Sequence, residues 1–264
     1  MHDKLDQKQP FIIVSDLDGT LLDHHNYSWQ SAKPALEEAR RREIPVVPCT
    51  SKTFAETRYL IRNIGLETPI ICENGSGIAM PDGKIIDLAP RYPLILEKLQ
   101  LLKRDSRFHL WGFHDMSPEE ISRQTGLSLE EAISAKDRRY SEPFLWQGKK
   151  TAFAEFERAA KKFNIDIVQG GRFYHALSRG VSKQRAINHL LLVLRMPDAH
   201  VIALGDSAND VSMLTQADTA VVVNNPTRNF PSLPTNHQNI HYTSAYGPAG
   251  WNDAIMSILE KNHG

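Results

Sequence analysis

Residues 11–20 read Phe-Ile-Ile-Val-Ser-Asp-Leu-Asp-Gly-Thr, and the rest of the chain is organised around this stretch. The apolar run 11–14 is short enough to be a buried strand rather than a helix. Asp16 and Asp18 follow where that strand ends, and residues two apart in an extended chain point the same way. Gly19 then allows a sharp turn. Because two like charges this close repel, the stretch predicts either a site for a hard divalent cation or a plain Asp-Gly turn.

The composition describes a chain of 264 residues in which 31 acidic side chains balance 31 basic ones. This length suits one large domain or two smaller ones. The balanced charge gives no indication of a nucleic-acid or membrane partner, and no apolar run approaches the roughly 20 residues that cross a bilayer. The polar residues 1–10 do not resemble a signal peptide and are expected to be a short disordered lead. Cys49 and Cys72 are expected to be reduced, buried thiols, which favours a cytoplasmic protein.

Strand-like and helix-like patterns alternate after the first strand. We expect a helix at 31–42, a strand at 44–49, a helix at 53–64 closed by Gly65, and a strand at 69–72. Such alternation predicts right-handed crossovers and a parallel sheet, in which ligands bind beyond the carboxyl ends of the strands. The polar motifs of this region all fall at such ends.

Two hydroxyl residues and a lysine follow the second predicted strand: Thr50, Ser51 and Lys52. A hydroxyl at the tip of a strand can hydrogen-bond a phosphoryl oxygen without adding charge. The alternative is that one of these hydroxyls caps the helix that follows. Lys52 is expected either to contact the substrate or to lie in solvent.

The pattern changes from about residue 83. A turn at 81–84, several helical stretches with Ser-x-x-Glu capping boxes at Ser117 and Ser128, and a hairpin over 165–177 indicate an α+β insert. We therefore predict an α/β fold with a Rossmann-like parallel-sheet core and an inserted α+β cap domain. The predicted boundaries are 1–82 and 179–264 for the core and 83–178 for the cap.

The insert carries four candidates for substrate contact, because arginine binds carboxylate or phosphate groups bidentately and histidine can also donate to them. They are Arg138, Arg139, Arg172 and His175. The alternative for each is a solvated or salt-bridged surface side chain, and we expect at least one of the four to contact the substrate. Glu142 would either accept hydrogen bonds from sugar hydroxyls or end a helix.

Two polar features follow the insert. Lys183 falls in the first turn of an amphipathic helix, where its charge opposes the helix dipole, so we expect it to neutralise a phosphate and nearby aspartates instead. The strand predicted at 200–204 ends in Gly-Asp-Ser-Ala-Asn-Asp, residues 205–210. An acidic turn that begins a helix is the alternative for this second stretch.

These stretches resemble the haloacid dehalogenase-like hydrolases, a superfamily that consists mostly of phosphatases. The Asp-x-Asp-Gly-Thr of 16–20 is similar to its motif I, and Gly-Asp-Ser-x-Asn-Asp of 205–210 is similar to its motif IV. Motif II is matched at Thr50, with Ser51 as the near alternative, and motif III at Lys183. The resemblance covers nearly the whole chain.

The resemblance implies a role for each matched residue. Asp16 would be the nucleophile that takes up the phosphoryl group, and Asp18 would be the general acid and base. Thr20 would support the site. Thr50 or Ser51, together with Lys183, would bind the phosphoryl oxygens.

The resemblance also implies Mg²⁺ as the cofactor. Asp206 would join Asp16 on the ion, and the main-chain carbonyl of Asp18 would coordinate it as well. Asp210 would orient the motif III lysine or a metal-bound water, and Asn209 would support the site.

The insert resembles the type IIB cap, and several stretches resemble mannosyl-3-phosphoglycerate phosphatases. These are residues 48–53, 71–75, 141–144, 171–175 and 247–251. The chain has Thr-Ser-Lys where the broader group has Thr-Gly-Arg, which favours the narrower family. The resemblance implies a small-molecule phosphorylated sugar derivative as substrate, namely mannosyl-3-phosphoglycerate, hydrolysed to mannosylglycerate and phosphate. Another sugar phosphate such as glucosyl-3-phosphoglycerate, a phosphosugar mutase and a non-catalytic sugar-phosphate binding module stay open, as does the oligomeric state.

Overall fold

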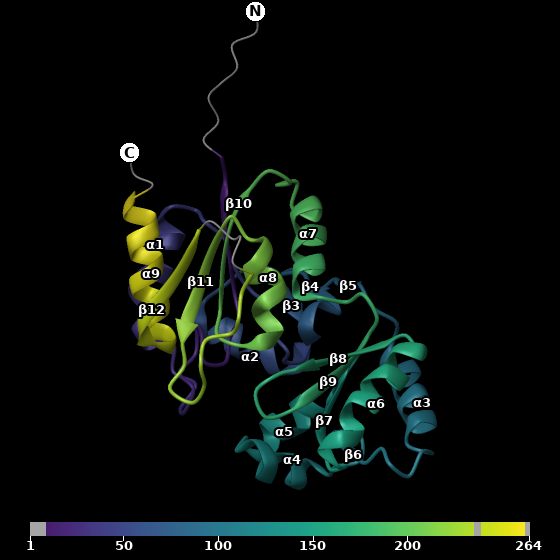
Figure 1. Ribbon diagram of the computed structural model, residues 1–264. Helices are drawn as coiled ribbons and strands as arrows, with labels where there is room; N and C mark the ends of the chain where they lie inside the picture. Colours follow the sequence, from purple (N-terminus) through teal and green to yellow (C-terminus); the bar gives the residue numbers. More distant parts are fainter. Residues whose placement is uncertain (1–8, 235–238, 262–264) are drawn as a thin grey trace, which may run out of the picture. The chain divides into compact units, whose positions relative to one another are not determined.

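The computed structural model describes residues 9–234 and 239–261, so most of the expected disordered lead lies outside the described residues (Figure 1). The chain divides into two compact units. The first contains Met1–Val47, Ile187–Asp206 and Met213–Gly264, and the second contains Pro48–Ala186 and Ser207–Ser212. The cap boundaries expected at 83 and 178 fall inside the second unit and stay a prediction.

A five-stranded sheet in the order β12-β11-β10-β1-β2 organises the first unit. Its strands are β1 (Phe11–Ser15), β2 (Val46–Pro48), β10 (His200–Gly205), β11 (Thr219–Asn224) and β12 (Ile240–Tyr246). β10 pairs in parallel with both β1 and β11, and β11 pairs in parallel with β12. The prediction of an α/β fold with a parallel sheet is confirmed.

The strand β12 was not expected, because residues 228–246 show little periodicity. It lies at the edge of the sheet, most of its residues are partly or fully exposed, and its register with β11 shifts between Val222 and Asn224. An edge strand buries little apolar surface, so its sequence carries a weak alternation signal.

Two helices and a short 3-10 helix pack together in the first unit. They are η1 (Gln30–Ala32), α1 (Lys33–Arg41) and α9 (Gly247–Lys261), and α9 also packs on β11 and β12. Trp251 of α9 is fully buried, and its Nε1–H donates to Ser15 Oγ at 3.0 Å. Ser15 is the last residue of β1. The C-terminal helix therefore holds the strand end from which the first acidic motif leaves.

The second unit begins with a short antiparallel sheet in the order β3-β4-β5. Its strands are β3 (Ile70–Cys72), β4 (Gly77–Ala79) and β5 (Ile85–Asp87), with the 3-10 helix η2 (Glu73–Gly75) between β3 and β4. Cys49 forms a parallel bridge with Ile71, which places the residues after β2 beside β3. The turn expected at 81–84 joins β4 to β5, as predicted.

The helix α2 (Phe54–Ile64) has a complete capping box. Its N-cap is Thr53, whose hydroxyl accepts from Glu56 N–H at 3.0 Å, and Gly65 closes it in the left-handed region at φ 76°. The alternative that Thr50 or Ser51 caps this helix is therefore wrong. Neither the Thr50 hydroxyl nor the Ser51 hydroxyl is the cap of α2.

A four-stranded antiparallel sheet in the order β6-β7-β9-β8 follows in the second unit. Its strands are β6 (Leu110–Gly112), β7 (Glu142–Trp146), β8 (Ile165–Gln169) and β9 (Tyr174–Ser178). Its helices are α3 (Tyr92–Leu102), α4 (Pro118–Thr125), α5 (Leu129–Lys136) and α6 (Lys150–Lys162). Ser117 and Ser128 form the predicted capping boxes at the starts of α4 and α5.

Successive side chains of β7 enter two different cores. Phe144 and Trp146 pack with Phe156 of α6, whereas Leu145 packs against the cluster formed by α4 and α5. Both faces of this sheet are therefore covered by helices. A strand buried on both faces lacks the alternation of apolar and polar residues, which explains why β6 and β7 were not expected from the sequence. Glu142 lies in β7, so the alternative that it ends a helix is wrong, while the alternative that it accepts hydrogen bonds from sugar hydroxyls stays a prediction.

Three helical segments connect these parts: α7 (Lys183–Val193), η3 (Ala208–Asp210) and α8 (Val211–Gln216). Cys49 and Cys72 are buried free thiols, as predicted, and burial raises the pKa of Cys72 to about 12. Within the described part of the chain, none of the helices has both the length and the apolar character needed to cross a membrane.

We expect Trp251→Ala to lower the free energy of unfolding by about 3–5 kcal/mol, because it leaves a large cavity beneath the end of β1. Urea unfolding followed by circular dichroism measures this change. Leu192→Ala, at a leucine that is 66% exposed, is the control and should change the free energy of unfolding by less than about 0.5 kcal/mol. Similar losses in the two variants would contradict the anchoring role of Trp251.

Candidate active site

The first acidic motif forms a tight turn directly after β1. Asp16 is buried, and its main-chain carbonyl accepts from the Ser15 hydroxyl at 2.7 Å. Leu22 N–H donates to Leu17 O at 2.8 Å, and Gly19 N–H donates to Leu22 O at 2.9 Å. These bonds fold residues 16–22 back on themselves, with Gly19 at φ 80° in the left-handed region.

Asp206, at the end of β10, is held by residues of the first unit. The Thr20 hydroxyl donates to its Oδ1 at 3.4 Å, and the Asn225 side-chain amide donates to its Oδ2 at 2.5 Å. A Cβ on Gly19 would lie 2.8 Å from Asp206 Oδ2 and 2.6 Å from Asn225 Nδ2, so no larger residue fits there. The supporting role of Thr20 stays a prediction, and the contact of Asn225 with Asp206 was missed. The place of Asn225 in an Asn-Asn-Pro turn after a buried strand gave it the appearance of a plain turn residue.

Lys183 is the first residue of α7 and is almost fully buried in the second unit. Its ammonium group donates to Asp210 Oδ1 at 2.5 Å and to Cys49 O at 2.7 Å. Asp210 accepts Ser207 N–H at 3.0 Å through its other oxygen. Asp210 and Lys183 thus form a direct, buried ion pair, while the role of Asp210 in orienting Lys183 or a metal-bound water stays a prediction.

Asn209 belongs to the same cluster of the second unit. Its side-chain amide donates to Asn74 Oδ1 at 3.1 Å, and its Oδ1 accepts from the Ser207 hydroxyl at 2.5 Å. Asn74 follows β3, so Asn209 connects the turn after β3 to the acidic turn at 207–210. The supporting role expected of Asn209 stays a prediction.

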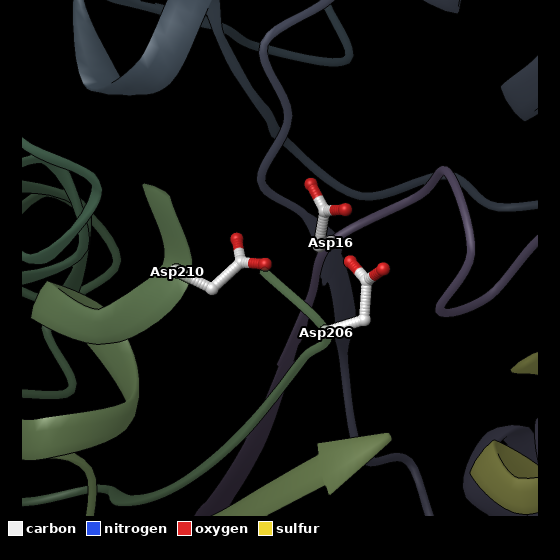
Figure 2. A group of neighbouring side chains, drawn as sticks. All are labelled: Asp16, Asp206 and Asp210. Carbon is white, nitrogen blue, oxygen red and sulfur yellow. The ribbon is translucent and has the colours of Figure 1, made fainter. Parts of the chain in front are cut away.

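Three buried carboxylates form a group: Asp16, Asp206 and Asp210. Figure 2 shows the three side chains as neighbours, and one oxygen of each lies within 4.8 Å of an oxygen of the others. Buried carboxylates at this spacing repel strongly without a cation. Since the donors are all hard oxygens, the group fits a divalent ion such as Mg²⁺ better than a soft metal.

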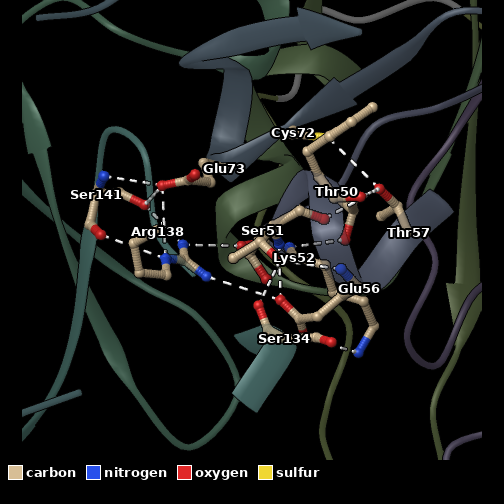
Figure 3. A network of polar contacts seen from close by, with 12 residues as sticks. Thr50, Ser51, Lys52, Glu56, Thr57, Cys72, Glu73, Ser134, Arg138 and Ser141 are labelled. Atoms are coloured by element: carbon tan, nitrogen blue, oxygen red, sulfur yellow. Dashed lines mark hydrogen bonds and ion pairs between the residues drawn. The ribbon is translucent and has the colours of Figure 1, made fainter. Parts of the chain in front are cut away.

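The turn at 50–52 has each of its three main-chain carbonyls held by a donor. Asn74 N–H donates to Thr50 O at 2.9 Å, Glu73 N–H donates to Lys52 O at 3.0 Å, and Arg138 Nη2 donates to Ser51 O at 3.1 Å (Figure 3). Lys52 does not lie free in solvent, since its ammonium is 3.8 Å from Glu56 and its side chain is 13% exposed. The turn is rigid, and its hydroxyls come from Thr50 and Ser51.

The structural role of Glu73 was not expected from the sequence. Glu73 is 1% exposed, and its carboxylate accepts the main-chain N–H groups of 139–141 at 2.9, 3.1 and 2.9 Å. The Ser141 hydroxyl also donates to it at 2.7 Å, and Arg138 Nε lies 3.5 Å away. The one sequence signal is its position at the end of a buried strand, and this position does not show which N–H groups it will accept.

The four candidates for substrate contact differ in their surroundings. Arg172 is exposed, and Arg139 is partly exposed with its N–H on Glu73. The Arg138 side chain is 2% exposed and is surrounded by protein groups. His175 is buried, and its Nδ1 has no hydrogen-bond partner among the described residues.

Burial shifts the pKa values of two side chains near this cluster. Burial, together with the positive charges of Arg138 and Lys183, lowers the pKa of His175 to about 3, so His175 is neutral. Burial raises the pKa of Glu142 to about 7, although Tyr92 and His114 N–H hydrogen-bond to it. In both side chains, burial shifts the pKa in the direction that favours the uncharged form.

Comparison with known proteins identifies the group that shares these features. The sequence model for haloacid dehalogenase-like hydrolases matches residues 13–117 and 130–232. A protein of Persephonella marina is 34% identical over 95% of this chain and 97% of its own length. A protein of Methanococcoides burtonii is 34% identical over 96% of this chain and 98% of its own length. Both are named glucosyl-3-phosphoglycerate/mannosyl-3-phosphoglycerate phosphatase.

A solved structure agrees with the fold. A sugar phosphatase of HAD subclass IIB superposes with a TM-score of 0.67 at 15% identity, covering 96% of this chain and 99% of its own. At this level of identity the likeness concerns the fold alone. The expected resemblance to type IIB proteins is confirmed at that level.

We expect Glu142→Gln to remove part of the pH dependence of stability. The pKa of Glu142 is raised from 4.5 to about 7 by burial, so the folded state binds this proton more tightly than the unfolded state does. Stability from this group is therefore present below pH 4.5 and is lost as the pH rises towards 7. Between pH 5 and pH 8, the wild type should lose about 2–3 kcal/mol relative to Glu142→Gln.

Urea unfolding at both pH values measures this difference. Glu260→Gln, at an exposed glutamate, is the control and should follow the wild type. Parallel pH profiles for the wild type and Glu142→Gln would show that Glu142 keeps an ordinary pKa in the folded protein.

Proposed function

The chain belongs to the haloacid dehalogenase-like hydrolase family, and from this premise we propose that it is a Mg²⁺-dependent phosphatase of mannosyl-3-phosphoglycerate and glucosyl-3-phosphoglycerate. Membership of the family makes the chain an enzyme, a phosphoric monoester hydrolase, as the sequence predicts. The observation that carries the proposal is the group of three buried carboxylates, one of which is also paired with Lys183.

The substrate part of the proposal rests on the relatives. Both are named for the glucosyl and the mannosyl compound, and each aligns with this chain over nearly its full length. The two sugars differ in the orientation of one hydroxyl, a difference that a site must read by hydrogen bonding. The shared name of the relatives favours a site that accepts both sugars. The sequence left open whether the substrate carries mannose or glucose, and we propose that this enzyme hydrolyses both compounds.

The carboxylate group supports a resident divalent cation. Asp16, Asp206 and Asp210 would hold Mg²⁺, as would the main-chain carbonyl of Asp18. When bound, the ion would neutralise charge on the phosphoryl oxygens and on the attacking carboxylate. The Thr20 and Asn225 contacts keep Asp206 oriented for this task.

The proposed first step is an in-line displacement at phosphorus. A carboxylate oxygen of Asp16 forms a bond to phosphorus while the ester oxygen leaves, which gives an aspartyl-phosphate. Asp18 donates its proton to the leaving alkoxide, so the product is the neutral alcohol. The Thr50 and Ser51 hydroxyls would donate to phosphoryl oxygens, and Lys183 would balance their charge.

The second step releases phosphate. Asp18, now a carboxylate, takes a proton from a water molecule as that water attacks phosphorus. The bond between phosphorus and the Asp16 oxygen breaks, which regenerates both aspartates in their starting states.

A phosphosugar mutase would share the first step and return the phosphoryl group to a sugar. A binding module would bind the sugar phosphate without chemistry, but Asp16, Asp18, Lys183 and Asp206 are all present in this chain. The assay below separates both alternatives from the phosphatase.

We expect purified protein with Mg²⁺ to release phosphate from mannosyl-3-phosphoglycerate and glucosyl-3-phosphoglycerate in preference to hexose phosphates and 3-phosphoglycerate. Asp16→Asn should lower kcat by at least about 1,000-fold, because an amide cannot form the covalent intermediate. A malachite green assay with a matched circular dichroism spectrum of the variant measures both properties.

Hydrolysis of hexose phosphates instead would keep the chemistry and remove the proposed substrates. Transfer of phosphate between sugars without net release would favour the mutase. Absence of any phosphate release by the folded wild type would overturn the proposed function.

We expect Asp206→Asn to weaken Mg²⁺ binding by about 100-fold, because it removes one negative ligand while Thr20 and Asn225 can still hold the side chain. Isothermal titration calorimetry measures the affinity, and the Mg²⁺ concentration for half-maximal activity gives a second readout. Asp253→Asn, at an exposed aspartate, is the matched control. An unchanged Mg²⁺ affinity in Asp206→Asn would place the ion elsewhere.

A further inference from the structure

One side chain from a distant part of the sequence holds one of the three main-chain carbonyls of the turn at 50–52. Two of its carbonyls are held by main-chain N–H groups of the turn at 73–74, whereas Ser51 O is held by the Arg138 guanidinium at 3.1 Å. Figure 3 shows the arginine reaching Ser51 from the segment that precedes β7. No other donor to Ser51 O is found among the described residues.

The Ser51 carbonyl controls the Thr50 hydroxyl through one rigid peptide plane. In a trans peptide the carbonyl and the following N–H point in opposite directions, so fixing Ser51 O also fixes Lys52 N–H. Lys52 N–H donates to Thr50 Oγ1 at 3.1 Å. Because Oγ1 accepts this bond, its own proton is left to be donated, and no described residue is found to accept it.

The Arg138 guanidinium is surrounded by protein hydrogen-bond acceptors and carboxylates. Its Nη2 donates to Ser141 Oγ at 2.6 Å, and its Nε donates to Ser141 O at 3.3 Å. Carboxylate oxygens of Glu73 and Glu56 lie 3.5 and 3.9 Å away. The side chain is 2% exposed, and its Nε and Nη2 donors are committed to protein acceptors.

From these contacts we infer that Arg138 is a positioning residue, which orients the Thr50 hydroxyl for a phosphoryl oxygen by holding the Ser51 carbonyl. The sequence made Arg138 a candidate for direct substrate contact, and the inference replaces that role. It rests on the proposed function, since it assigns how the phosphate-binding turn of that same site is kept in place.

The planar fork of arginine is needed for this role. One guanidinium spans the Ser141 and Ser51 acceptors while facing two carboxylates, and its geometry is fixed when three donors are engaged. A lysine keeps the charge that balances Glu73 and Glu56 but cannot reach Ser141 and Ser51 in the same way. Arg138→Lys therefore separates the positioning function from charge balance.

The experiment is a double-mutant cycle with inorganic phosphate as the probe. Isothermal titration calorimetry in the presence of Mg²⁺ gives the phosphate affinity of the wild type, Arg138→Lys, Thr50→Val and the double variant. We expect each single variant to bind phosphate about tenfold more weakly. We expect the double variant to bind no more weakly than Thr50→Val, because Arg138 acts through the hydroxyl that Thr50→Val has removed.

Two further variants keep the result interpretable. Ser141→Ala retains Arg138 but removes the hydroxyl that accepts from its Nη2. This variant should weaken phosphate binding about threefold, and it should have no effect in the Thr50→Val background. It serves as the test if Arg138→Lys does not fold. Arg107→Ala is the matched control, since Arg107 also pairs with two carboxylates but is 59% exposed. Its phosphate affinity should equal that of the wild type.

Steady-state kinetics distinguish positioning from substrate contact. Positioning should lower kcat/KM about equally for p-nitrophenyl phosphate and for mannosyl-3-phosphoglycerate, because both present the same phosphoryl group. A loss confined to mannosyl-3-phosphoglycerate, with phosphate affinity unchanged, would make Arg138 a substrate contact and overturn the inference. Additive losses in the double variant would also overturn it, because they would show a general structural effect.

Failure of the proposed function gives a different pattern. If the wild type releases no phosphate from any ester, the calorimetric cycle still tests the inference, since it measures binding alone. A wild type that does not bind phosphate would overturn the inference as well.

Discussion

The Glu73 carboxylate is the constraint on which the polar framework of the second unit depends. A buried carboxylate is stable only when its hydrogen-bonding capacity is filled, and here the three N–H groups of 139–141, the Ser141 hydroxyl and the nearby Arg138 fill it. Glu73, Asn74 and Gly75 all have positive φ values, of 48°, 58° and 95°. Each non-glycine residue in this conformation costs about 1–3 kcal/mol, so the turn persists because its surroundings hold it in several ways at once.

The turn at 73–75 contacts several motifs that are far apart in the sequence. Its N–H groups hold the carbonyls of the turn at 50–52, and the Asn74 side chain accepts from Asn209. A Cβ on Gly75 would lie 2.2 Å from Ser182 O, so the chain can pass this close to the start of α7 only at glycine. A change at 73–75 would therefore disturb the hydroxyl turn, the lysine and the acidic turn together.

The sequence predicted the parts of the site that follow buried strands, because the period of the apolar residues marks where a strand ends. Asp16 and Asp206 were predicted in this way, and so was the parallel sheet, whereas Lys183 was predicted from its unfavourable place in the first turn of a helix. Glu73 was not assigned a role, since a single glutamate gives no signal of the N–H groups that it will accept from 139–141. The role of Arg138 differs from the first expectation for the same reason. An arginine within a helix-rich segment looks solvent-facing until the fold brings it beside Ser51 and Glu73.

The charges of the site explain why a neutral hydroxyl turn is useful. Three buried carboxylates form a group, and the Lys183 ammonium is paired with one of them, Asp210. A guanidinium nitrogen of Arg228 lies 3.9 Å from a second, Asp206. Three carboxylates at this spacing still favour the binding of a divalent cation. A phosphoryl group then brings further negative charge. Lys52 lies 3.8 Å from Glu56, so its charge is largely committed. Under the proposed function, oriented hydroxyl dipoles stabilise the charge of the phosphoryl group, and no further ion has to be desolvated. Arg138 and the Glu73 turn keep these hydroxyls oriented before the substrate binds.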